Sequence, residues 1–328
     1  LSRDIGLMTG DHGIASARFF FLLGFAACIP AIISGGVVGR MRFSSQAAAG
    51  LVIGSLIYPV FEGFVWGRIP FMGQEGALFD RMFGMPFVDF AGSVVVHSIG
   101  GWLALPAIIL LGPRNKRYDG NFDTRPSNIP FLALGSWILI IGWFGFNLMS
   151  AQSLSNISGL VAINSLMAMV GGIISGLLLS KNDIGFTYNG ALAGLIAVCA
   201  GADIFHPVAA LAVGAVAGCL FIVCFRFETE VLHIDDVLGV WPLHGINGTW
   251  GGIAAGLFGN SLFGAVGTRS LAAQLAGSAV AIVYALGTGF VLYALLKRFT
   301  NMRMSEFEEL IGSDRVFHNI EAYPEESM

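Results

Sequence analysis

The sequence predicts an all-α polytopic membrane protein. Hydrophobic residues make up 55% of the 328 residues and charged residues only 12%, and the mean hydropathy is +0.76. A helix needs about 20 residues to cross the hydrocarbon core of a bilayer, and several uncharged runs are that long. Glycine, with 45 residues, is about twice as frequent as usual. Glycines within apolar helices let helix backbones approach closely in lipid, so we expect a tightly packed bundle.

Composition argues against several other classes of protein. The net charge of -4 and the scattered basic residues leave no electrostatic footprint for nucleic acid. The four cysteines, Cys28, Cys199, Cys219 and Cys224, fall in apolar runs without CxxC spacing, so we expect buried thiols rather than disulfides or zinc ligands. No serine or cysteine stands beside a base in a recognisable motif. We therefore expect no enzyme, no cofactor and no metal.

The apolar runs divide into nine expected spans. The uncharged block 126–180 is interrupted by the polar turn 151–156, which separates spans four and five. The other seven spans are 19–39, 43–66, 90–111, 187–200, 207–225, 238–258 and 270–296. Nine spans place the two ends of this stretch on opposite sides of the membrane.

The distribution of basic residues predicts the orientation, because cytoplasmic loops retain lysine and arginine. All but five of the 17 basic residues lie in the tail or in loops that follow odd-numbered spans. We therefore expect a cytoplasmic C-terminus in the inner or plasma membrane, with the loops 67–88 and 151–156 outside. The expected domains are a membrane domain over 1–300 and a cytoplasmic tail over 301–328.

An internal repeat organises the chain. Residues 89–101 and 236–248 both read Asp-x2-Gly-x4-His-x-Ile-x-Gly, so each copy starts a span with an aspartate and places a histidine eight residues later. Eight residues of continuous helix would put each imidazole about 12 Å deeper than its aspartate. Both His97 and His244 are therefore expected well inside the membrane.

An ionisable residue inside a span is costly and points to a functional site. Two separately hydrogen-bonded core histidines are the simpler alternative, but matching positions in two copies of a repeat favour a paired imidazole site at the midplane. Neutral imidazole offers one donor and one acceptor, so two rings can share a proton. Zinc would need three or four ligands, and no third ligand lies at a similar depth to His97 and His244.

Further candidates lie at the ends of spans. Asp89 and Asp236 stand at span entrances, where a carboxylate can cap free backbone N–H groups; structural capping and a role near a cation path are compatible. Aromatic residues near external span ends fit either an interfacial belt or a cation–π site, with the hydroxyl of Ser150 just beyond. These aromatic residues are Phe21, Phe25, Trp66, Phe144 and Phe146.

These motifs resemble the ammonium transporter family, the Amt/Mep/Rh proteins, and in particular the bacterial Amt type. The resemblance rests on the blocks 89–97, 142–147 (GWFGFN), 189–195 (NGALAGL) and 244–251 (HGINGTWG), together with 305–309 and 321–324 in the tail. It covers about residues 15–325. Two positions depart from the family pattern: Cys199 stands where a threonine is usual, and Ser93 where a glycine is usual.

The resemblance implies the ammonium-transporter fold, an inverted repeat with nine of the family's eleven spans visible, and a role for each matching residue. His97 and His244 match the twin pore histidines, Phe25 and Phe146 match the gating phenylalanines, and Phe21 lies beside this gate. Trp66 and Ser150 match the ammonium-recruiting positions, and Asp89 matches the acidic residue beside them.

The resemblance also implies partners and a second possible function. It predicts a homotrimer that conducts ammonium or ammonia, with a cytoplasmic PII-type regulator. Some family members are instead ammonium sensors fused to an output domain such as a histidine kinase, which bind ammonium with little or no transport. A sensor would share almost every pore residue, so this alternative stays open from the sequence.

Overall fold

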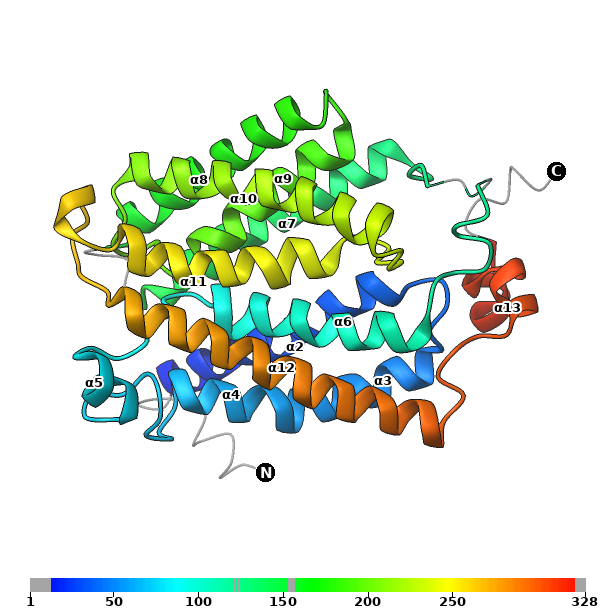
Figure 1. The fold of residues 1–328 in the computed structure, drawn as a ribbon, viewed down its shortest axis with the longest axis horizontal. Helices are drawn as coiled ribbons and strands as arrows, with labels where there is room; N and C mark the ends of the chain where they lie inside the picture. The colour runs from blue at the N-terminus through cyan, green and yellow to red at the C-terminus, as the bar shows by residue number, and fades with distance from the viewer. Residues whose placement is uncertain (1–12, 121, 123, 153–156, 322–328) are drawn as a thin grey trace.

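The structure is a computed structural model that describes residues 13–120, 122, 124–152 and 157–321. Within these ranges the fold is helical, without a strand, and an isolated β-bridge joins Met41 to Arg303. Most helices run along the long axis of the molecule (Figure 1). The short helix α5 (Leu78–Phe83) lies at one end, the α5 end, and α13 (Glu306–Ile311) lies at the opposite end, the α13 end.

Seven helical segments of the described chain are long and apolar enough to cross a membrane. Four of them are built around one helix each: α2 (Gly13–Val37), α7 (Ile129–Ser150), α8 (Ser158–Leu179) and α12 (Leu271–Phe299). The other three combine α-helix with π-helical turns. The segment Phe43–Val65 contains α3 (Phe43–Val52), η2 (Ile53–Ile57) and α4 (Tyr58–Val65). The segment Ser93–Leu111 contains η3 (Ser93–Ser98) and α6 (Ile99–Leu111), and the segment Pro207–Val231 contains α10 (Pro207–Arg226) and η4 (Phe227–Val231).

Two shorter helical segments complete the expected set. These are α9 (Ile184–Val198) and the continuous run of η5 (Trp241–Ile246) and α11 (Asn247–Phe258). Short helices lie outside these runs: η6 (Ser261–Phe263) near the α5 end, and α13 and η7 (Asp314–His318) in the tail. The predicted fold class is therefore confirmed, and the nine expected spans each correspond to a helical run.

Several predicted boundaries need correction. α2 includes Gly13, six residues before the expected start, because the helix continues past Arg18 beyond the uncharged stretch that we used to set the boundary. The third and eighth spans begin later than expected, at Ser93 and Trp241, because the residues around each aspartate are not helical. The continuous helix that we assumed between each aspartate and its histidine is therefore absent, since His97 is only the fifth residue of its helical run.

Two apolar clusters form the core. One joins α2, α3, α4, α6 and α12, and the other joins α7, α8, α9, α10 and α11. Figure 1 shows the same division into two layers of helices. The repeat-related runs η3–α6 and η5–α11 point in opposite directions along the long axis and overlap near the middle of the molecule. The histidines of the repeat lie near the start of each run, within this overlap.

Glycine makes this crossing possible. A Cβ atom on Gly101 would lie 2.0 Å from the backbone nitrogen of Gly245, and a Cβ atom on Gly248 would lie 2.3 Å from the carbonyl oxygen of Ser93. Each glycine stands four residues after the histidine of its own copy. Any side chain at these positions would push the two helices apart, so the repeat specifies both the histidines and the contact that aligns them.

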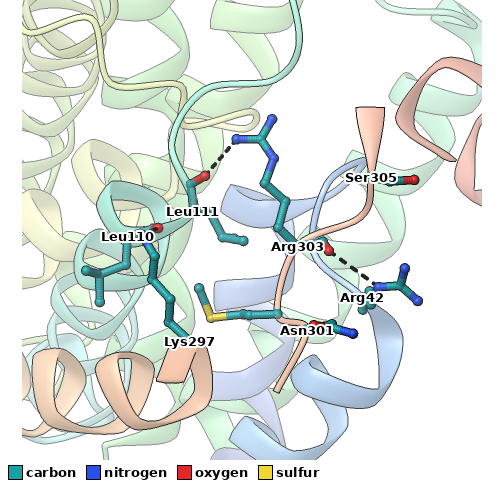
Figure 2. Close-up of a pocket in the computed structure, with 8 residues that line it drawn as sticks. Arg42, Leu110, Leu111, Lys297, Asn301, Arg303 and Ser305 are labelled. Atoms are coloured by element: carbon teal, nitrogen blue, oxygen red, sulfur yellow. Dashed lines mark hydrogen bonds between the residues drawn. The ribbon is translucent and has the colours of Figure 1, made fainter. Parts of the chain in front are cut away.

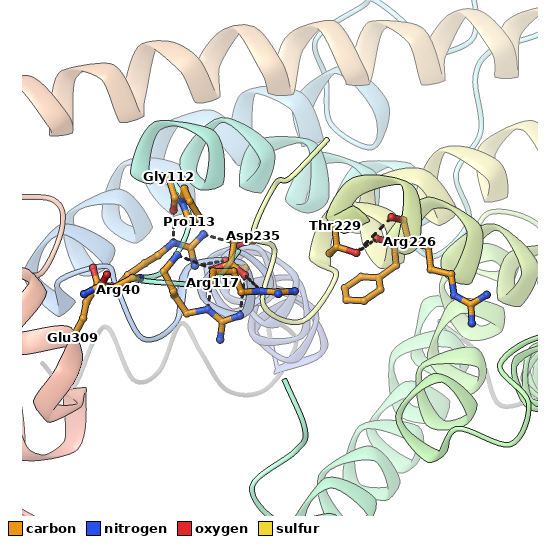
Figure 3. A network of polar contacts seen from close by, with 12 residues as sticks. Arg40, Gly112, Pro113, Arg117, Arg226, Thr229, Asp235 and Glu309 are labelled. Carbon is orange, nitrogen blue, oxygen red and sulfur yellow. Dashed lines mark hydrogen bonds and ion pairs between the residues drawn. The ribbon is translucent and has the colours of Figure 1, made fainter. Parts of the chain in front are cut away.

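A polar network holds the α13 end together (Figure 3). The guanidinium of Arg40 is fully buried and donates to the backbone carbonyls of Gly36, Gly112 and Asp235. The carboxylate of Asp235 in turn accepts from Arg114. This network links the end of α2, the loop after α6 and the loop before η5.

The tail docks on this same end of the protomer. Met302 and Met304 are buried, and their backbones bond to Arg42 and Arg40. The side chain of Arg42 forms an ion pair of 2.6 Å with Glu308 on α13. The first part of the predicted tail is therefore packed rather than free, whereas the predicted aromatic anchor Tyr323 lies outside the described residues.

Candidate functional site

Asp89 shapes the start of the helix that carries His97. Its carboxylate accepts hydrogen bonds from the backbone N–H groups of Gly92, Val94 and Val95 at 2.8–3.0 Å. Gly92 has φ +99°, a left-handed conformation that side chains rarely tolerate. The capping that we predicted for Asp89 is therefore present, and it satisfies N–H groups that no helical turn can reach.

The second copy of the repeat is capped less completely. Gly239 also adopts a positive φ, +66°, and Asp236 accepts from the backbone N–H of Trp241 at 2.7 Å. The other carboxylate oxygen of Asp236 is buried without a hydrogen-bond partner. The repeat therefore preserves the aspartate and the turn, but only Asp89 uses both oxygens.

The two histidines of the repeat face each other. Their Nδ1 atoms are 3.2 Å apart and their ring centroids 5.3 Å apart. Two neutral rings can share this contact only if one Nδ1 donates and the other accepts. One Nε2 atom is then an acceptor and the other a donor, so the pair can both take and give a proton at its outer edges. The Nε2 atom of His97 is buried and has no hydrogen-bond partner among the residues that the structure describes.

A stack of aromatic rings leads to this pair. The rings of Phe25 and Phe146 are 4.1 Å apart with an interplanar angle of 30°, and Phe21 lies 4.7 Å from Phe25. Phe146 is 5.5 Å from the ring of His97. Trp66 is 5.8 Å from Phe25 on the other side. The predicted residues from α2, α7 and the end of α4 thus form one connected series that ends at the histidines.

Trp66 is positioned by Asp89. Its indole N–H donates to the backbone carbonyl of Asp89 at 2.7 Å, so Asp89 both caps the helix that carries His97 and orients the indole ring of Trp66. Ser150 is not part of this cluster of contacts. Its hydroxyl donates to the carbonyl of Phe146 at 2.9 Å, one turn back on α7.

Three residues near the site had no role in the sequence-based prediction. Trp143 stacks on His97 with ring centroids 4.9 Å apart and an angle of 20°. Its indole N–H donates a hydrogen bond to the sulfur of Cys199, and the thiol of Cys199 in turn donates to the side-chain oxygen of Asn147. Trp143 and Asn147 belong to the block GWFGFN, but only the fold shows that they support the histidine from the side.

The charged groups of this region do not suggest a metal centre. Within the ranges that the structure describes, no three His, Cys, Asp or Glu side chains are grouped to hold a metal ion. The aromatic rings, the two imidazoles and the capping carboxylate of Asp89 form one connected cluster in this part of the structure.

Comparison with known proteins establishes the family. The sequence model described as "Ammonium Transporter Family" matches residues 5–323. The chain belongs to this family. It is 40% identical to the ammonium transporter Amt2 of Methanocaldococcus jannaschii over 330 residues, which cover 99% of this chain and 74% of the relative. It is also 33% identical to the ammonium transporter of Bacillus subtilis, with 98% and 80% covered.

Solved structures of the family have the same fold. A protein called "Sensor Amt Protein" has a TM-score of 0.79 and 32% identity, covering 90% of this chain and 75% of that one. The Rh50 protein of Nitrosomonas europaea has a TM-score of 0.71 and 25% identity, covering 92% and 76%. The resemblance to the Amt/Mep/Rh proteins is confirmed, and the sequence relatives are named as transporters rather than as enzymes. Family membership and seven long apolar helices indicate an integral membrane protein.

Proposed function

We propose that the protein conducts ammonium across the membrane along the path that runs from Trp66 past Phe25 and Phe146 to His97 and His244. The observation that carries this proposal is the continuous series of ring contacts ending at the imidazole pair. Sequence comparison supports it, through membership of the Ammonium Transporter Family and through a relative 40% identical that is named an ammonium transporter.

Recruitment of the cation is the first step. An ammonium ion that leaves water for the rings of Trp66 and Phe25 gains cation–π attraction of about 0.5–2 kcal/mol per ring. We assign the supporting polar contact to Ser150 and a further aromatic contact to Phe21. Ammonium can also donate hydrogen bonds, which offset part of the free energy that it loses on dehydration. Sodium cannot donate hydrogen bonds, so the site favours ammonium. The backbone bond from Trp66 to Asp89 keeps the outer ring in place.

Deprotonation follows at the phenylalanine gate. The tight pair Phe25–Phe146 leaves no water-filled route for an ion, so ammonium gives up its proton to the histidine pair and passes as ammonia. The proton enters at the Nε2 atom that is an acceptor, crosses the Nδ1–Nδ1 hydrogen bond, and leaves from the Nε2–H group of the other ring to rejoin ammonia beyond the pair.

The arrangement in the membrane is part of the proposal. We assign the α13 end to the cytoplasm, because most of the basic residues between spans lie there. The membrane domain then covers 1–300 and the tail 301–328, in a homotrimer in the inner or plasma membrane. We assign the docked tail to regulation, by contact with a PII-type signal protein.

Uptake into vesicles tests the proposed function. Purified protein is reconstituted into liposomes, and uptake of radiolabelled methylammonium is measured against empty liposomes. Saturable uptake that responds to pH supports a transporter. Saturable binding without flux would contradict the proposal and indicate a sensor, a function suggested by the name of one structural neighbour. The transporter is favoured because the sequence relatives carry transporter names.

A further inference from the structure

An open pocket of about 490 Å3 lies at the α13 end, where α6 and α12 end and the tail begins (Figure 2). Its lining combines three cations with neutral polar and apolar groups. The residues that matter here are Arg42, Leu110, Lys297, Asn301, Arg303 and Ser305. None of them belongs to the path that we propose for ammonium.

The three cations of the pocket are not equally compensated. Arg42 pairs with Glu308, and Arg303 pairs with Glu309 at 2.7 Å. Lys297 donates to the backbone carbonyl of Leu110 at 2.6 Å. In the described part of the chain it has no carboxylate partner, and two of its three N–H donors remain. The pocket therefore carries a net positive charge, with Lys297 as its uncompensated group.

The surface beside the pocket is strongly apolar. Phe299, the last residue of α12, is 75% exposed, and Phe43, the first residue of α3, is 74% exposed. Leu295 is half exposed one turn before Phe299. In a membrane protein such side chains face the acyl chains. A basic pocket at the end of such a surface has the two parts that an anionic phospholipid needs, a site for the phosphate and a surface for its tails.

We propose that this pocket binds the phosphate group of an anionic phospholipid from the leaflet on the α13 side. Lys297 supplies the charge, and the side chains of Asn301 and Ser305 supply neutral donors. Because the pocket is lined both by the end of α12 and by the start of the tail, the bound lipid holds residues 301–305 against the bundle. Docking of the tail then depends on the lipid composition of the membrane.

Lipid titration of the purified protein tests this site. Dioctanoyl phosphatidylglycerol is added to the protein in neutral detergent, and bound molecules are counted by native mass spectrometry. Removing one interfacial charge weakens binding about fivefold, so Lys297→Gln should raise the Kd about fivefold and Lys297→Arg should retain binding. The bond from Lys297 to the Leu110 carbonyl is exposed, so its loss should change the thermal midpoint without lipid very little.

Arg298→Gln is the matched control, because it removes the same charge one residue along and outside the pocket lining. It should leave the Kd within about twofold. An equal loss of lipid affinity in both variants would mean that the lipid is attracted by the overall positive charge of this surface, and it would overturn the proposed site. Displacement of the lipid by inorganic phosphate would indicate a soluble anion instead and would overturn the lipid assignment.

A measurement on the unaltered protein gives an independent test. The same lipid should slow hydrogen exchange of the backbone amides over 301–305, whereas dioctanoyl phosphatidylcholine should not. Equal exchange with both lipids would contradict the proposed link between lipid and tail.

Discussion

The imidazoles of His97 and His244 lie with their Nδ1 atoms 3.2 Å apart, although their helices point in opposite directions along the molecule. This contact depends on the close crossing of the same two helices at Gly101 and Gly248. Because both features recur at the same spacing in the two copies, the repeat encodes the geometry of the site as well as its chemistry.

Trp66→Leu should weaken ammonium binding about 5- to 30-fold, since a cation–π contact worth about 1–2 kcal/mol is lost. The half-saturation concentration for methylammonium uptake measures this change. Trp137→Leu is the control, because Trp137 is a tryptophan of α7 that is 58% exposed, away from the ring series. Equal half-saturation concentrations in the two variants would remove Trp66 from recruitment.

Gly248→Ala should destabilise the protein by about 1–3 kcal/mol or more, because the new methyl group would overlap the backbone of Ser93. The thermal midpoint in detergent should fall. Gly135→Ala is matched to it, since a Cβ atom at Gly135 meets nothing within 4 Å; alanine there should leave the midpoint unchanged or raise it. A midpoint for Gly248→Ala as high as that of Gly135→Ala would show that the helices do not cross this closely.

The Asp235 network should make the α13 end resistant to mild acid. Burial would raise the pKa of Asp235, but hydrogen bonds from Arg114 and the charges of Arg114 and Arg40 lower this pKa from 3.8 to about 2. A lowered pKa stabilises the fold above pH 3.8, by about 2 kcal/mol here, and this contribution disappears as the pH falls through about 2.

Comparison with Asp235→Asn measures this contribution. The difference in thermal midpoint from the unaltered protein should be constant between about pH 5 and pH 8 and shrink below pH 4. Asp183→Asn is the control. The exposed side chain of Asp183 caps α9 by accepting from the backbone N–H of Phe186, and asparagine caps a helix equally well. A difference for Asp235→Asn that does not shrink in acid would show that its charge is unimportant.

Arg42→Glu should loosen the tail, because it places a like charge beside Glu308. Exposed ion pairs contribute about 0.2–1 kcal/mol, so trypsin cleavage at Arg315 should become about threefold faster. Adding Glu308→Arg should slow cleavage again, whereas Arg68→Gln on an exposed loop should have no effect. No recovery in the double variant would mean that the pair does not hold the tail.

Much of the fold could be predicted because apolar runs and polar turns are local features. The repeated Asp-x2-Gly-x4-His pattern also predicted that His97 and His244 form one site. The late helix starts at Ser93 and Trp241 were missed, because they depend on side chains of Asp89 and Asp236 turning back onto the backbone. Such hydrogen bonds are not visible in the periodic pattern of apolar residues, which is the signal that we used to place the helix ends.

Supporting residues were harder to predict than the residues they support. Trp143 looks like any aromatic residue of an apolar span, and only the position of α7 places it on the ring of His97. From the sequence, Arg40 is expected to be an exposed cation in a loop, yet its side chain is fully buried and donates to three backbone carbonyl groups. Trp143 lies more than 45 residues from His97, and two of the three Arg40 acceptors, Gly112 and Asp235, lie more than 70 residues from Arg40. No local pattern connects such distant residues.

The current carried by ammonium through the histidine pair tests the central claim most directly. Proteoliposomes on a solid-supported membrane receive pulses of ammonium, potassium and sodium, with His318→Ala, an exposed histidine of the tail, as the control. For the double variant His97→Ala/His244→Ala, the account predicts that the ammonium current is lost or that potassium and sodium also pass, because no imidazole pair remains to separate ammonia from its proton. An unaltered ammonium current with unaltered selectivity would contradict it.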